Sequence, residues 1–157
     1  MACVLGLDPG YGRLGFGAVS IAGGRTCVLD CGIISTKTGD AFGTRLAQMA
    51  DDAETLLREL KPSKLVVEKL YFTKNAKTAM QVAESRGVLL LLAARHGIPV
   101  VEYTPSQVKS AICGDGRADK KGIQKMVKLI LNLKSAPKID DAADALALAL
   151  MGVSERL

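Results

Sequence analysis

The sequence lacks tryptophan and has one histidine, His96, with three tyrosines and three phenylalanines among its 157 residues. His96 is expected at the end of an apolar helix, where its side chain can cap the last carbonyl groups, so we assign it no catalytic role. Nucleophilic hydrolysis that depends on a histidine triad has no other histidine to draw on and is disfavoured.

Cysteines are also few. Cys3, Cys27, Cys31 and Cys113 lack the density of a secreted disulfide scaffold and form no CxxC pair of the kind found in zinc sites. We therefore expect reduced thiols in a cytoplasmic protein. Cys27 and Cys31 lie four apart in a predicted strand and would share one face, where core packing is favoured over the alternative of metal contact.

No basic and then apolar leader precedes the first strand, and the longest apolar run, residues 88–94, is too short to cross a bilayer. The length predicts one globular domain over residues 1–157. An excess of 21 lysines and arginines over 16 acidic residues gives a net charge of +5. This balance favours a polyanionic partner such as nucleic acid, although a basic surface that only aids solubility is the alternative.

The pattern of apolar residues predicts three strands, followed by alternating helices and strands and then by helices. Strands are expected at residues 3–7, 14–21, 26–35, 64–68 and 99–102, and helices at 42–60, 76–96, 106–111, 119–132 and after Pro137. This order is typical of an α/β domain with a five-stranded mixed sheet flanked by helices.

Residues 10–15 read GYGRLG, which matches the dinucleotide-binding pattern GxGxxG and follows a strand, with Asp30 at the spacing of a ribose-binding acid. That fingerprint requires a helix after the glycines, whereas residues 16–21 have β propensity. We therefore interpret the glycines as a tight hairpin that leaves the space over Asp8 open to a phosphate backbone.

Four carboxylates are placed where they could meet. Asp8 and Glu68 end two predicted buried strands, and side chains at the carboxyl ends of neighbouring strands gather at one edge of a sheet. Asp141 and Asp144 are three residues apart, so they share a face of the last helix. Asp140 points elsewhere, and we interpret it as the helix N-cap.

Four converging carboxylates would repel one another unless a cation lay between them. Oxygen ligands without histidine or thiolate favour Mg²⁺ or Mn²⁺ over zinc. Two such ions about 4 Å apart can activate water and stabilise the leaving oxygen in phosphodiester cleavage. With the basic charge, this site predicts metal-dependent hydrolysis of nucleic acid.

One predicted helix carries lysines along one side. They are Lys120, Lys121, Lys125 and Lys128, with Lys109 and Arg117 just upstream. Such a face is often simply solvated, but beside an acidic site it could hold a polyanion. Tyr71 and Phe72 follow the Glu68 strand, where they could stack on a nucleobase or pack on the core.

Several segments together resemble the RuvC family of Holliday-junction resolvases, the crossover junction endodeoxyribonucleases of the ribonuclease H-like superfamily. They are LGLDPGYGRLGFG, LVVEKLYFTKNAKTA, AESRGV, EYTPSQVK, GDGRADK and DDAADALALAL, which extend over nearly the whole chain. The resemblance implies a ribonuclease H-like fold and two Mg²⁺ ions per active site, with Mn²⁺ able to substitute. It implies that the catalytic metal ligands are Asp8, Glu68, Asp141 and Asp144.

The resemblance also implies a homodimer that cuts two opposed strands of a four-way DNA junction, in recombination and repair, with RuvA and RuvB as branch-migration partners. The dimer would form at the helix that contains Arg86 and Gly87. The predicted DNA-binding residues are Tyr71, Lys74, Lys109, Lys120 and Lys121, and Tyr71 stands where relatives have phenylalanine.

Two other functions fit parts of the pattern. A strand that ends in aspartate before glycines also suits an ATP-dependent phosphotransferase of the actin and sugar-kinase type, but such proteins normally need two similar domains and a longer chain. A junction-binding module without catalysis is the second alternative, and the complete acidic set argues against it.

Overall fold

The computed structural model describes residues 2–70 and 76–154. All the predicted elements are present among them, with bounds close to those expected. The strands are β1 (Cys3–Pro9), β2 (Arg13–Ala22), β3 (Arg25–Ser35), β4 (Lys64–Glu68) and β5 (Val100–Tyr103). The helices are α1 (Phe42–Leu60), α2 (Ala76–Arg95), α3 (Pro105–Cys113), α4 (Lys120–Ile130) and α5 (Asp140–Ser154).

The strands form one mixed sheet in the order β3-β2-β1-β4-β5. β1, β2 and β3 pair antiparallel, whereas β4 pairs parallel with both β1 and β5. Gly23 and Gly24 form the turn between β2 and β3 with φ angles of +56° and +77°, a conformation that glycine adopts without a steric penalty. The predicted five-stranded mixed sheet is confirmed.

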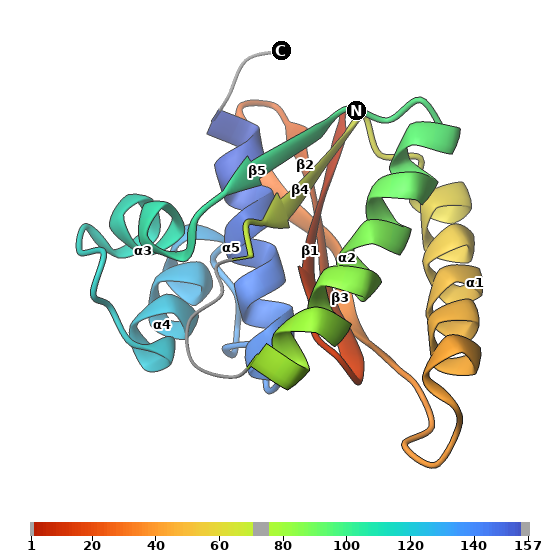
Figure 1. The fold of residues 1–157 in the computed structure, drawn as a ribbon. Helices are drawn as coiled ribbons and strands as arrows, with labels where there is room; N and C mark the ends of the chain where they lie inside the picture. The colour runs from red at the N-terminus through yellow and green to blue at the C-terminus, as the bar shows by residue number, and fades with distance from the viewer. Residues whose placement is uncertain (1, 71–75, 155–157) are drawn as a thin grey trace.

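Helices cover both faces of the sheet (Figure 1). Leu5 and Leu7 of β1 point toward the core beneath α1 and α2, while Val4 points into the core beneath α3, α4 and α5. This alternation follows from the two-residue period of a strand. Asp8 lies four residues after Val4 in the same strand, so its side chain points to the same face of the sheet, the one covered by α5.

α5 lies directly on the sheet because glycines remove the side chains that would hold it away. A methyl group on Gly6 would lie 2.0 Å from the backbone oxygen of Ala145, and one on Gly15 would lie 2.3 Å from that of Asp141. Gly10 does form the expected hairpin, since its N–H donates to the Arg13 carbonyl at 2.9 Å. The hairpin interpretation was wrong for Gly15, because the helix backbone covers it.

One prediction about the cysteines was also wrong. Ala18 pairs with Asp30 but Val19 pairs with Val28, so β3 has an extra residue between these pairs. A bulge of this kind reverses the facing of the residues beyond it. Cys31 therefore packs beside the α5 core, whereas Cys27 is exposed, and the two thiols do not share a face.

The end of α2 differs from expectation in its histidine. Gly97 ends the helix with a φ of +64°, as a C-terminal glycine is expected to do. The His96 side chain does not cap the helix but contacts Glu54 of α1, with Nε2 and Oε2 2.9 Å apart. This hydrogen bond is the main cause that lowers the pKa of Glu54.

No described helix has the length and apolar content needed to cross a bilayer.

Candidate active site

Asp8 and Glu68 lie side by side at the carboxyl ends of two parallel strands. Leu7 of β1 is in register with Val67 of β4, so the next residue of each strand reaches the same edge. Val66, two residues before Glu68, packs in the core beneath α5, which places Glu68 on the same face as Asp8. The predicted meeting of these two carboxylates therefore follows from strand register.

The first turns of α5 bring two more carboxylates to this edge. Asp8, Asp141 and Asp144 each offer an oxygen atom, and these atoms all lie within 4.8 Å of one another. Glu68 is outside this group of three but lines the same cavity, which has a volume of about 300 Å³. The structure thus gathers all four predicted acids around one cavity.

The charges in this cavity are incompletely balanced. Burial, followed by repulsion from Glu68, raises the pKa of Asp8 to about 7. Burial and then repulsion from Asp144 raise the pKa of Glu68 to about 7 as well. The pKa of Asp144 is also raised, chiefly by burial. A hard divalent cation at this oxygen-only cluster would replace the protons that these carboxyl groups otherwise retain.

The raised pKa values predict an unusual dependence of stability on pH. The pKa of Asp8 rises from 3.8 to about 7 and that of Glu68 from 4.5 to about 7, so protonation favours the folded state. This stabilisation is complete below the ordinary values and is lost as the pH rises through about 7. In EDTA, we expect the Tm to be higher at pH 5 than at pH 8, by roughly 5 °C.

Thermal melts at both pH values, with and without Mg²⁺, test this expectation. Mg²⁺ should raise the Tm more at pH 8 than at pH 5, because the ligands must be deprotonated to bind it. NaCl at matched ionic strength is the control for screening. A metal-free Tm that falls or stays level from pH 8 to pH 5 would contradict the proposed electrostatics.

Lys109 and Lys120 provide positive charge at the same cavity. Both lower the pKa of Glu68, and Lys120 lowers that of Asp8. Their helices begin at well-formed caps. The Thr104 hydroxyl accepts a hydrogen bond from the Gln107 N–H at the start of α3, and the Asp119 carboxylate accepts one from the Gly122 N–H at the start of α4.

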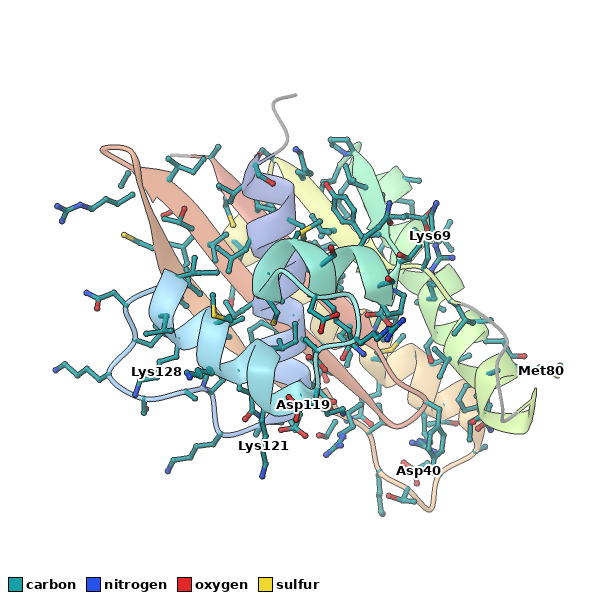
Figure 2. The ribbon with its side chains drawn as sticks, turned by 90° about the vertical axis from the view of Figure 1, so that its left-hand side faces the viewer. Asp40, Lys69, Met80, Asp119, Lys121 and Lys128 are labelled. Atoms are coloured by element: carbon teal, nitrogen blue, oxygen red, sulfur yellow. The ribbon has the colours of Figure 1, made fainter. Side chains whose placement is uncertain are left out.

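The other predicted DNA-binding residues are placed differently. Lys121 is exposed and extends from α4 away from the protein (Figure 2), and it does not line the acidic cavity. Tyr71 and Lys74 lie outside the described residues, as does Phe72. The structure therefore places two of the five predicted DNA-binding residues, Lys109 and Lys120, at the cavity.

The interpretation of Asp140 as N-cap was wrong. Asp140 is the first residue of α5, and the Ala143 N–H donates to the Ile139 carbonyl one position earlier. The Asp140 carboxylate instead accepts a hydrogen bond from the Gln124 side chain and lies 3.9 Å from Lys120 Nζ. It therefore joins α5 to α4, outside the cluster of three.

Two arginines at this site were missed by the sequence interpretation. Arg13 Nε lies 3.0 Å from an oxygen of Asp141. Arg86 of α2 donates from Nε to the backbone oxygen of Glu68 at 3.3 Å and forms an ion pair with Glu102 of β5. Arg13 lies in the motif GYGRLG and Arg86 in AESRGV, but neither motif indicates the partner of its arginine, which is distant in sequence. Arg86 thus holds the end of β4 from the opposite face of the sheet.

Comparison with known proteins identifies the family. The family model for crossover junction endodeoxyribonuclease RuvC matches residues 4–152. The RuvC of Pseudothermotoga lettingae is 44% identical over 146 residues, which cover 93% of this chain and 90% of that protein. The RuvC of Gloeobacter violaceus is 49% identical over 150 residues, which cover 95% of this chain and 86% of that protein.

A solved structure agrees with these sequence relatives. T. thermophilus RuvC in complex with a Holliday junction substrate superposes with a TM-score of 0.90 at 33% identity, covering 98% of this chain and 93% of that one. The predicted ribonuclease H-like fold is confirmed, and so is the resemblance drawn from the motifs. The chain belongs to the RuvC family of crossover junction endodeoxyribonucleases.

Proposed function

We propose that this chain is a divalent-metal-dependent endonuclease that hydrolyses phosphodiester bonds in four-way DNA junctions. The observation that carries the proposal is the cluster of Asp8, Asp141 and Asp144, whose oxygen atoms lie within 4.8 Å of one another beside Glu68. Family membership supports the choice of substrate, because the T. thermophilus relative was solved with a Holliday junction substrate. Residues 1–157 would form a single nuclease domain.

The four carboxylates would hold the metal, and their oxygen-only chemistry suits Mg²⁺, with Mn²⁺ as a substitute. Two ions at such a site would activate a water molecule and stabilise the leaving oxygen. Lys109 and Lys120, which line the same cavity, would bind the scissile phosphate and offset its charge. Arg86 would keep Glu68 in place through its backbone oxygen.

The assembly is proposed from the family. Two copies would act as a homodimer that cuts opposed strands symmetrically, working with RuvA and RuvB in the cytoplasm. α2 supports this proposal in one respect, because Met80 and Leu91 are exposed at 63% and 51% on its surface. Gly87 lies between them on the helix, and a methyl group added there would have no heavy atom within 4 Å outside its own stretch of helix.

A cleavage assay on matched DNA substrates tests the function. Purified protein with Mg²⁺ is given a four-way junction, a fork and a linear duplex of the same sequence, each labelled on one strand at a time. We expect paired nicks in opposed strands of the junction, with ligatable 5′-phosphate and 3′-hydroxyl ends. If the protein cut the linear duplex efficiently and left the four-way junction intact, the proposed junction specificity would be refuted.

Lys120 and Lys121 provide an internal comparison of cavity and surface charge. Lys120 lines the acidic cavity, whereas its neighbour Lys121 does not. We expect Lys120→Gln to lower the single-turnover cleavage rate at saturating enzyme by about tenfold or more, because it removes a charge at the scissile phosphate. Lys121→Gln should weaken junction binding slightly and leave that saturated rate near wild type. Equal rate losses would show that position relative to the cavity is irrelevant.

A further inference from the structure

A second hollow adjoins the acidic cavity and shares Asp8 and Asp141 with it. Its volume is about 540 Å³, and its other walls come from the β1–β2 hairpin, the segment after β3 and α1. We call it the Arg45 hollow. The lining residues that matter here are Tyr11, Gly12, Thr36, Thr38 and Arg45.

Arg45 is a buried cation in this hollow. Only 8% of its surface is exposed. Its Nε donates to Thr36 Oγ1 at 2.9 Å and its Nη2 donates to the Tyr11 carbonyl at 3.3 Å. The Tyr11 ring lies over the guanidinium, 5.7 Å from centroid to Cζ. These contacts hold the guanidinium in one orientation.

The charge of Arg45 is unpaired among the residues that the structure describes. Within residues 2–70 and 76–154, no carboxylate lies within ion-pair distance of its guanidinium. Burial of an unpaired charge is costly, and a guanidinium has five N–H donors, of which the protein contacts use only part. An anion in the hollow would offset both the charge and the remaining donors.

Gly12 provides the room for this arrangement. A methyl group at Gly12 would lie 2.8 Å from Arg45 Nη2. A side chain at the middle glycine of GYGRLG would collide with the buried Arg45 side chain, just as a side chain at Gly15 would collide with the backbone of α5. The turn that follows the Asp8 strand therefore packs against the Arg45 side chain through Tyr11 and Gly12.

We propose that the Arg45 hollow binds a backbone phosphate of the cleaved strand, next to the scissile phosphate. The inference rests on the proposed function, which places the scissile phosphate at Asp8 and Asp141. Since those residues also border the hollow, the neighbouring nucleotide of the same strand reaches Arg45. The planar fork of a guanidinium matches phosphate oxygens, and the Thr38 hydroxyl adds a neutral donor.

The test combines a protein variant with a chemically altered substrate. Junctions carry one neutral methylphosphonate at successive positions around the cut, and binding is measured in Ca²⁺. In the wild type, one flanking position should weaken binding about tenfold. In Arg45→Gln, unmodified junction should bind about tenfold more weakly, with a salt slope smaller by about 0.7–0.9, and that methylphosphonate should cause no further loss.

The matched control is Arg25→Gln, which makes the same change at an exposed arginine. Arg25 lies at the far end of β3, opposite Ala22, whereas the hollow lies at the Ser35 end. This variant should keep the wild-type methylphosphonate pattern. Equal losses from methylphosphonate in wild type and Arg45→Gln at every position would overturn the inference.

A second variant keeps the test decisive if Arg45→Gln does not fold. Thr38 is exposed at the hollow, so Thr38→Asp adds a negative charge there without a packing change. It should weaken junction binding several-fold, while Thr55→Asp on the exposed side of α1 should not. Wild-type affinity in Thr38→Asp would refute the hollow as a phosphate site. Failure of the wild type to bind or cut junctions would refute the proposed function instead.

Discussion

Replacing Glu68 with glutamine is expected to abolish junction cleavage while junction binding is retained. Glutamine keeps the shape of the side chain but removes the charge that a divalent cation requires. Loss of a ligand should cost several kcal/mol of transition-state stabilisation, so cleavage should fall by at least about a thousandfold. Single-turnover cleavage and a binding assay in Ca²⁺ measure the two properties separately.

The same variant should be more stable than the wild type in EDTA at pH 8. Glu68 is the second cause, after burial, of the raised pKa of Asp8, so a neutral amide relieves a repulsion that the folded protein otherwise carries. A Tm above that of the wild type, together with lost activity, distinguishes removal of a ligand from damage to the fold.

Glu59→Gln is the matched control for Glu68→Gln, because Glu59 is exposed near the end of α1. It should retain both cleavage and the wild-type Tm in EDTA. Asp144→Asn should behave like Glu68→Gln. Cleavage by Glu68→Gln within a few-fold of the wild type would exclude Glu68 as a metal ligand, and loss of junction binding would assign it a binding role.

Replacing Gly6 with alanine is expected to destabilise the protein by about 3 kcal/mol or more. The added methyl group would lie 2.0 Å from the Ala145 oxygen and 2.7 Å from the Ala149 nitrogen, and both are backbone atoms of α5. Backbone cannot rotate away as a flexible side chain can, so the helix must shift off the sheet. Because α5 carries Asp141 and Asp144, activity should fall with stability.

Denaturant unfolding of Gly6→Ala and Gly43→Ala checks this expectation. Gly43 lies in α1 with no atom near its missing side chain, so alanine there should raise stability by roughly 0.5–1 kcal/mol. The two variants make the same chemical change with opposite predicted signs. A Gly6→Ala protein as stable as the wild type would mean that α5 does not need to touch the sheet.

The secondary structure could be predicted well because its signals are local. Helical spacing and Pro62 bounded α1, and a short apolar run bounded β4, at the residues where the structure has them. The bulge in β3 could not be predicted, because it depends on pairing with β2. The misplacement of Cys27 and Cys31 on one face followed from that single extra residue.

The candidate site could be predicted where strand ends and helix spacing decide geometry. Asp8 and Glu68 end neighbouring strands, and Asp141 and Asp144 share a helix face, so local rules were enough to bring them together. Local rules do not give the distances between side chains on different elements. Only the structure shows that Asp8, Asp141 and Asp144 form a group within 4.8 Å and that Glu68 lines the same cavity outside this group.

The sequence by itself determined the strand and helix order, the four acids and the family, because these depend on residue type, spacing and motif. Only the tertiary structure explained two glycines of GYGRLG. Without side chains, Gly12 leaves room for Arg45 and Gly15 leaves room for α5, and both neighbours come from distant parts of the chain. The tertiary structure alone also placed Arg86 behind Glu68 and left Arg45 without a carboxylate among the described residues. Such contacts depend on the distance between elements, which periodicity does not encode.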